Sequence, residues 1–214
     1  STLFPYTTLF RSVKLEKTDA NAGTKGDLVV FNWGEYIDPE TIEEFESETG
    51  INVIYEEFET NEVMYAKLAQ DPSSYDVICP SDYMISKMIS QNMLEELDFD
   101  KIPNAKENIG EEYYKESEGF DPGNLYSVPY CWGTVGILYN KTMVDEPITG
   151  WKSLWDEKYS GRILMQDSVR DAFMVAQRIL GYSMNTVDEK ELNEAADMLK
   201  KQRSEEHTSE LQSR

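Results

Sequence analysis

The segment LVVFNWGEYIDP, residues 28–39, contains the change from strand to helix on which the predicted fold rests. Its apolar first half predicts a buried strand over Asp27–Trp33. Asp38 followed by Pro39 is a typical helix start, because Asp accepts hydrogen bonds from the first amides and Pro fits the first turn. Gly50 is suited to end that helix in a left-handed conformation. A strand that leads directly into a helix is the repeating unit of parallel sheets.

The same order occurs twice more along the chain. A second strand is expected over Ile51–Tyr55, with a helix that begins at Thr60 or Asn61. A third strand, Asp76–Cys79, precedes a helix that begins near Asp82. This order predicts an α/β fold with a doubly wound parallel sheet. The apolar positions at helical spacing, which we assign to the core, are Met64, Leu68, Met84, Ile85, Met88 and Ile89.

The second half of the chain is more irregular. Residues 93–125 are polar and are expected to form surface loops with short helices. The strand-like stretch Tyr126–Tyr139 is interrupted by Pro129 and Gly133, which suits a crossing between two lobes. Beyond it we expect a short helix within Trp151–Tyr159, a strand over Arg162–Gln166, a helix over Val169–Leu180, and a last helix with a capping box of Thr186 and Glu189.

Both ends of the chain resemble translated sequencing adapters and lack helical or strand periodicity. We therefore interpret residues 1–12 and 203–214 as non-native. Residues 13–26 are interpreted as a flexible leader, 27–130 as an incomplete first lobe, and 131–202 as the N-terminal part of a second lobe. The only histidine, His207, falls in the end segment, which removes histidine-based catalysis from the expected functions.

The charge balance limits the ligands that the chain can bind. It has 20 basic and 41 acidic residues, which gives a net charge of −21. Such a chain repels nucleic acids and anionic membrane surfaces but attracts cations, although acidity can also serve solubility alone. Cys79 and Cys131 form no metal or redox motif; free buried thiols are expected, and a single disulfide stays open. No apolar run approaches the roughly 18–20 residues of a membrane helix.

Aromatic and acidic side chains are expected at one edge of the sheet. In open parallel sheets, ligands bind beyond the carboxyl ends of the strands. That rule selects Trp33, Glu35, Tyr36, Glu59, Ser81, Asp82 and Tyr83, and in the second lobe the segment Asp167–Asp171. Aromatic rings and carboxylates together suit an organic ammonium group. Glu35 and Asp82 have a structural alternative, since an acid near a helix N-terminus is stabilised by the helix dipole.

Catalytic motifs are missing from the sequence. It contains no glycine-rich phosphate loop, no GxSxG and no HExxH. A glycosidase that uses paired carboxylates stays open, because acidic residues are plentiful, although their spacing does not favour it.

Five phrases in order resemble the bacterial spermidine/putrescine-binding proteins, the extracytoplasmic receptors of polyamine ABC transporters. These phrases are FNWGEY from Phe31, ETNEVMYAKL from Glu59, YDVICPSDY from Tyr75, VPYCWG from Val128 and WKSLW from Trp151. The resemblance implies a two-lobed type II periplasmic-binding-protein-like fold that closes on its ligand, of which this chain would be the truncated N-terminal part. It also implies a monomeric, non-catalytic receptor for putrescine or spermidine, without metal or cofactor, that is periplasmic or lipid-anchored and delivers its ligand to membrane permease subunits.

The resemblance extends to individual positions. Trp33, Tyr36, Ser81 and Tyr83 match ligand-lining residues of the family, Glu35 matches an acid near one amine, and Asp171 matches an amine-binding carboxylate of the second lobe. Two positions depart from the pattern. Ser168 stands where spermidine-preferring members have aspartate, and Gly34 replaces a hydroxyl residue of some members. The ligand-binding residues expected from these arguments are Trp33, Glu35, Tyr36, Ser81, Asp82, Tyr83, Ser168 and Asp171.

Two other functions are alternative hypotheses for this chain. A receptor for another amine or for a sugar would have the same fold but a different ligand. An extracellular hydrolase would use Glu35 or Asp171 as a general acid.

Overall fold

The computed structural model describes residues 3–10 and 26–205 of the chain, with side chains described over residues 26–202. The chain divides into two compact units that meet in sequence between Thr134 and Val135. The predicted lobe boundary after Tyr130 is four residues earlier and stays a prediction. Each unit is described by itself below.

Three strand–helix units build the first unit, as the sequence predicts. Asp38 caps the first helix by accepting a hydrogen bond from the Glu40 amide at 3.0 Å, and Gly50 ends it with φ 68°. Thr60 caps the second helix through the Val63 amide at 3.2 Å. The elements are β2 (Leu28–Trp33), α1 (Pro39–Thr49), β3 (Val53–Phe58), α2 (Asn61–Gln70), β4 (Val77–Ile78) and α3 (Asp82–Ser90).

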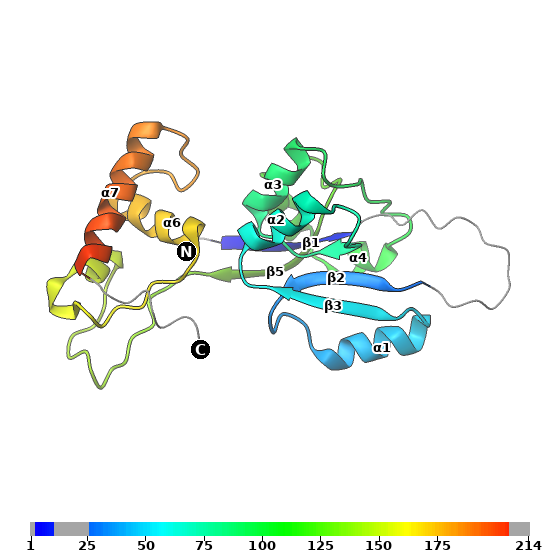
Figure 1. Cartoon of the computed structure of the whole chain (residues 1–214), viewed down its shortest axis with the longest axis horizontal. Coiled ribbons are helices and arrows are strands. Elements are labelled where there is room, and N and C mark those ends of the chain that lie inside the picture. The colour runs from blue at the N-terminus through cyan, green and yellow to red at the C-terminus, as the bar shows by residue number, and fades with distance from the viewer. Residues whose placement is uncertain (1–2, 11–25, 206–214) are drawn as a thin grey trace, which may run out of the picture. The chain divides into compact units, whose positions relative to one another are not determined.

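The sheet is open and has the strand order β3-β2-β4-β1-β5, where β1 is Leu3–Phe10 and β5 is Val128–Thr134. Strand β2 runs parallel to both β3 and β4, with Trp33 opposite Phe58 and Phe31 opposite Ile78. Helix α1 covers one face of the β2–β3 pair, while α2 and α3 lie on the other (Figure 1). The expected α/β class with a parallel β2–β3–β4 sheet is confirmed.

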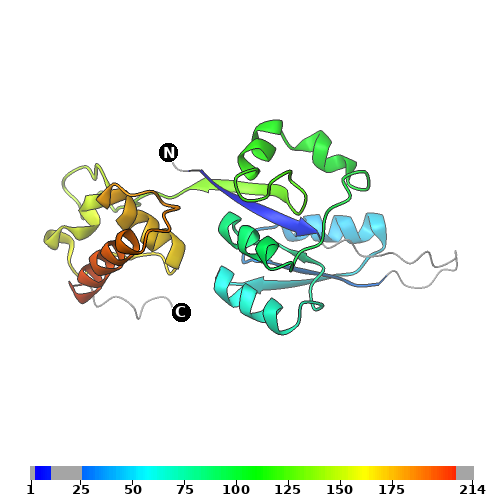
Figure 2. The same cartoon turned by 90° about the horizontal axis from the view of Figure 1, so that it is seen from above.

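Strand β1 was not expected, because residues 1–12 lack strand periodicity. Leu3–Phe10 instead pairs antiparallel with β4 on one side and with β5 on the other. Figure 2 shows β1 alongside β5. Strand pairing uses main-chain groups, so two open strand edges can accept an extended segment whatever its side-chain periodicity. Whether residues 1–12 are native stays a prediction.

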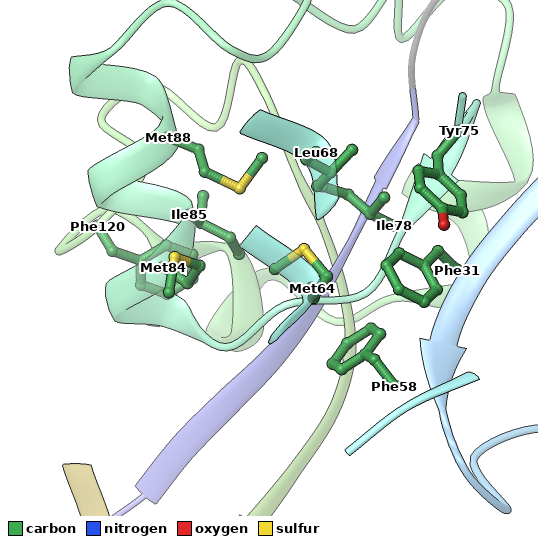
Figure 3. Close-up of a cluster of buried hydrophobic side chains, with 10 residues drawn as sticks. All are labelled: Phe31, Phe58, Met64, Leu68, Tyr75, Ile78, Met84, Ile85, Met88 and Phe120. Carbon is green, nitrogen blue, oxygen red and sulfur yellow. The ribbon is translucent and has the colours of Figure 1, made fainter. Parts of the chain in front are cut away.

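The core of the first unit lies between the sheet and helices α2 and α3 (Figure 3). Phe31 is completely buried at its centre, stacked on Tyr75 with ring centroids 4.2 Å apart and edge-on to Phe58 at 4.9 Å. The methionines predicted as core residues are buried as expected. The core cluster consists of Phe31, Phe58, Met64, Leu68, Tyr75, Ile78, Met84, Ile85, Met88 and Phe120.

Between α3 and β5 the chain forms the predicted loops and short helices, α4 (Pro103–Asn108) and α5 (Glu111–Ser117). The fully buried Asp121 fixes the approach to β5 by accepting hydrogen bonds from the Leu125 and Tyr126 amides and the Ser127 hydroxyl. Both cysteines are free thiols; Cys79 is buried as expected, whereas Cys131 is only half-buried.

The second unit has two 3₁₀ turns, η1 (Trp151–Trp155) and η2 (Glu157–Tyr159), followed by α6 (Val169–Leu180) and α7 (Glu189–Glu205). The expected strand over residues 162–166 is not formed. Its side chains do alternate between half-buried and exposed, as in a strand, but no strand pairs with it in the described part of this unit. An alternating pattern without a pairing partner does not make a strand.

The start of α7 also differs from the prediction. Asp188 caps this helix by accepting hydrogen bonds from the Lys190 and Glu191 amides, while the Thr186 hydroxyl accepts one from the Asp188 amide. The predicted box of Thr186 and Glu189 was wrong, because an aspartate lies one residue before the first helical position and is at least as good a cap as threonine. In the described residues, no helix is both long enough and apolar enough to cross a membrane.

Replacing Phe31 by alanine is expected to lower the free energy of unfolding by about 3–5 kcal/mol, because a cavity opens between Tyr75 and Phe58. Urea denaturation measures the loss. Leu138→Ala is the matched control: Leu138 is 99% exposed, so its loss should stay within about 0.5 kcal/mol. Equal losses in the two variants would contradict the assignment of this core.

The chain is also expected to lose stability at alkaline pH. Burial raises the pKa of Tyr75 from 10.0 to about 12, aided by the hydrogen bond that its hydroxyl donates to Glu56. Burial likewise raises the pKa of Tyr55 to about 12. The unfolded chain ionises these phenols first, so their contribution is complete below pH 10 and is lost as the pH rises towards 12. Urea denaturation across this pH range should show a smaller decline in the free energy of unfolding for Tyr75→Phe than for the parent chain. Equal declines would refute the contribution of the buried Tyr75 phenol.

Candidate functional site

Three loops meet at one edge of the sheet in the first unit. Because β2, β3 and β4 are parallel, the loops that follow Trp33, Phe58 and Ile78 all leave from the same edge. This is the edge at which open α/β sheets bind ligands. The candidate residues of the first unit belong to these loops and to the first turn of α3, so the structure gathers them as predicted.

The aromatic part of the site is built on Trp33. Its ring packs on Phe58 with centroids 4.5 Å apart, and the ring of Tyr36 lies 6.1 Å from it at an angle of 41°. Phe58 is buried, whereas Trp33 and Tyr36 are only half-buried. The core therefore supports one side of the Trp33 ring, and the two tilted rings form a rigid apolar surface at the end of β2.

Two tyrosines hold the main chain of this loop, and sequence reasoning missed both. The Tyr55 hydroxyl of β3 donates to the Trp33 carbonyl at 3.4 Å, and the Tyr130 hydroxyl of β5 donates to the Tyr36 carbonyl. Burial raises the pKa of Tyr55 and of Tyr130, so both hydroxyls keep their protons at neutral pH. The pairing of β2 with β3 could have indicated Tyr55, but the contact of Tyr130 spans 94 positions and leaves no local signal.

A second pair of contacts joins the starts of α2 and α3. The amide of Asn61, a residue only 6% exposed, bonds twice to Ser81: it donates to the hydroxyl and accepts from the main-chain N–H, both at 3.0 Å. The Tyr83 hydroxyl donates to Glu62 Oε1 at 3.0 Å. Asn61 and Glu62 were not predicted as site residues, although they follow the Glu59 that the sequence singled out.

Carboxylates without a cationic partner lie at the same edge. Glu35 is exposed in a left-handed conformation with φ 58°, and the carboxylate of Glu57 approaches Gly34, where an added Cβ would lie 3.5 Å from Oε2. Within residues 26–202, no lysine or arginine forms an ion pair with Glu35, Glu57 or Glu62. Uncompensated negative charge at a cluster of aromatic rings attracts an organic cation.

Asp82 contributes to the start of α3. Its carboxylate accepts a hydrogen bond from the Tyr83 amide at 2.7 Å, at the start of α3. This contact is the helix-start function that the sequence left open for Asp82. A ligand contact by Asp82 stays a prediction.

Ser168 and Asp171 belong to the second unit. Ser168 caps α6, where its hydroxyl accepts from the Asp171 amide at 3.3 Å. Asp171 lines a cavity of about 410 Å³ within that unit, among mostly apolar neighbours such as Leu154 and Val175. Their participation in a ligand site together with the first unit stays a prediction.

No metal centre is found in the part of the chain that the structure describes, where no group of three or more histidine, cysteine, aspartate or glutamate side chains could hold an ion.

Comparisons with known proteins identify similar chains. The family model of bacterial extracellular solute-binding proteins matches residues 40–210. The spermidine/putrescine-binding periplasmic protein of Salmonella typhimurium is 41% identical over 89% of this chain and 54% of its own length. The chain thus spans about half the length of the curated relatives it matches.

Two solved structures of binding proteins are also similar to this chain. The substrate-binding protein of a spermidine/putrescine ABC transporter from Streptococcus pneumoniae is 45% identical, with a TM-score of 0.66 over 85% of this chain and 55% of that one. A lipoprotein of Treponema pallidum is 33% identical, with a TM-score of 0.77 over 85% and 56% of the two chains. These structures support the two-lobed fold class predicted from the sequence.

Removing the hydroxyl of Tyr130 is expected to loosen the loop after Trp33. Tyr130→Phe loses the hydrogen bond to the Tyr36 carbonyl, worth about 1 kcal/mol, so amides of residues 34–38 should exchange about fivefold faster with deuterated solvent. Mass spectrometry of peptides from this loop measures the rates.

Tyr114→Phe provides the control for that experiment. It removes the same kind of bond, from a phenol to the Ala105 carbonyl at 3.1 Å, but outside the loop. In Tyr114→Phe, the amides of residues 34–38 should exchange at the same rate as in the parent chain. An unchanged loop in Tyr130→Phe would show that Tyr130 does not position it.

Proposed function

This chain belongs to the bacterial extracellular solute-binding proteins, and on that premise we propose that it is a receptor for small polyamines. It binds putrescine or spermidine outside the cytoplasm and delivers the ligand to the membrane permease of an ABC importer. The observation that carries the proposal is the edge of the sheet in the first unit, where two tilted aromatic rings lie among carboxylates that have no cationic partner within residues 26–202.

The chemistry of this edge suits a flexible diamine. An ammonium group over Trp33 or Tyr36 gains about 0.5–2 kcal/mol from the ring, depending on how dry the contact is. A hydrogen bond from that ammonium to Glu35 adds roughly 1.5–3 kcal/mol. The apolar ring faces pack against the methylene chain, which a sugar lacks. The site therefore favours an alkyl amine over a sugar.

We propose Asp171 as an amine-binding carboxylate of the second unit. The carboxylate stands in the first turn of α6 and lines the cavity of that unit. Ser168 at the cap of α6 affects the choice of polyamine. Because aspartate caps a helix as well as serine does, the fold permits either residue there. An uncharged Ser168 favours the shorter diamine, which has one charge fewer than spermidine.

Names of the relatives support the cellular setting. The Salmonella relative is a periplasmic protein and the Treponema relative is a lipoprotein. We infer that this protein works on the outer side of the cytoplasmic membrane, either free or lipid-anchored. We further propose that it acts as a monomer and that it binds its ligand without catalysing a reaction; the family's description as solute-binding proteins supports the second point.

Titration calorimetry tests the proposal. A hybrid in which residues 27–202 of this chain replace the matching part of the Salmonella relative provides a complete pair of lobes. Putrescine and spermidine should release heat and glucose should not. Absence of heat with both polyamines overturns the proposal, and heat with glucose would favour a sugar receptor.

Two variants assign the binding to this chain rather than to the Salmonella part. Glu35→Gln is expected to weaken polyamine binding about tenfold, because the ammonium loses a charged acceptor. Glu44→Gln removes the same charge from an exposed position on α1 and should change the affinity less than twofold. Equal effects would refute the role of Glu35. Turnover of a glycoside or ester that Glu35→Gln abolishes would favour a hydrolase.

A further inference from the structure

The hydrogen bond between Tyr83 and Glu62 has a fixed direction. The phenol has a single proton, which it donates to Glu62 Oε1 at 3.0 Å. An ionised carboxylate can only accept, so the phenol cannot reverse its role while Glu62 is in place. Any further polar group that approaches the Tyr83 oxygen therefore meets a hydrogen-bond acceptor.

The surrounding contacts keep Tyr83 and Glu62 close together. Asn61 precedes Glu62 at the start of α2, and Ser81 lies two residues before Tyr83 at the start of α3. Two hydrogen bonds of 3.0 Å join Asn61 to Ser81, and Asn61 is almost completely buried. The first turns of the two helices are thereby tied together, which keeps the Glu62 carboxylate within reach of the Tyr83 hydroxyl.

An ammonium group is a hydrogen-bond donor with no acceptor of its own. A freely rotating phenol could point its proton at the ligand and repel it. A phenol that donates its proton to Glu62 cannot point that proton at the ligand. Its oxygen also carries extra negative charge, because hydrogen bonds in a chain polarise one another.

We propose that Glu62 is a positioning residue of the ligand site: it fixes the Tyr83 hydroxyl as an acceptor for an ammonium group of the ligand. Glu62 acts through Tyr83 and need not touch the ligand. This assignment rests on the proposed function, since it specifies how the same site selects amines over ligands that offer acceptors.

A purely structural role makes a different prediction. Glu62 stands in the first turn of α2, where a negative charge stabilises the helix. In that case Glu62→Gln would lower the stability of the fold and leave the affinity of the folded protein unchanged. Measuring affinity and stability separately distinguishes the two roles.

A double-mutant cycle with Tyr83 tests the proposal in the hybrid described above. Putrescine affinity is measured by calorimetry for the parent, Glu62→Gln, Tyr83→Phe and the double variant. Glu62→Gln should weaken binding about tenfold when Tyr83 is present, because the amide can donate as well as accept and no longer fixes the phenol. In the Tyr83→Phe background the same substitution should have less than a twofold effect.

Glu44→Gln is again the matched control. It removes an equal charge from an exposed residue on α1, which forms no hydrogen bond with Tyr83. Its affinity should change less than twofold, and urea denaturation should show that every variant is fully folded under the conditions of the titration.

Each other outcome is decisive against the proposal. Equal weakening by Glu62→Gln in both backgrounds would show that Glu62 acts independently of Tyr83. No weakening at all would reduce Glu62 to a helix-start residue. If the parent hybrid binds neither polyamine, the proposed function itself fails, and this result is distinct from a parent that binds and a variant that is unaffected.

Discussion

The parallel pairing of β2 with β3 and β4 is the constraint on which the rest of the first unit depends. It places the ends of three strands at one edge, with Trp33 opposite Phe58 at the last position of the pair. Parallel strands need crossover connections, and helices α1 and α2 provide them on opposite faces of the sheet. The loops that carry the candidate ligand residues are therefore neighbours because of the topology, before any side chain contributes.

Side-chain packing then makes that edge rigid. Phe31 lies between Tyr75 and Phe58, and Phe58 in turn supports Trp33, so the aromatic surface of the site is continuous with the core. Hydrogen bonds complete the arrangement from three elements, since Tyr55, Tyr130 and Asn61 each hold a main-chain group or side chain of a site loop. Contacts of this kind preorganise a site, and preorganisation reduces the entropic cost of binding a ligand.

In the proposed receptor, charge gives this edge its selectivity. The chain has 41 acidic residues against 20 basic ones, and the lysines that form ion pairs in the described part do so with other acids, as Lys67 does with Glu56 and Lys158 with Glu146. Glu35, Glu57 and Glu62 are left without such partners in that same part of the chain. In the proposed receptor the ligand provides the missing positive charge, and the direction of the Tyr83 hydroxyl adds a requirement for a donor.

The sequence by itself determined the strand–helix order, the caps at Asp38 and Thr60, the methionine core and the edge that carries Trp33, Tyr36 and Ser81, because these depend on local periodicity and on a general rule of parallel sheets. Only the tertiary structure decided that Leu3–Phe10 pairs as a strand, that residues 162–166 do not, and that Asp82 serves the start of α3. It also revealed Tyr130, Asn61 and Glu62. The physical reason is that strand pairing and side-chain hydrogen bonds need partners distant in sequence, and a local pattern records only what each residue offers.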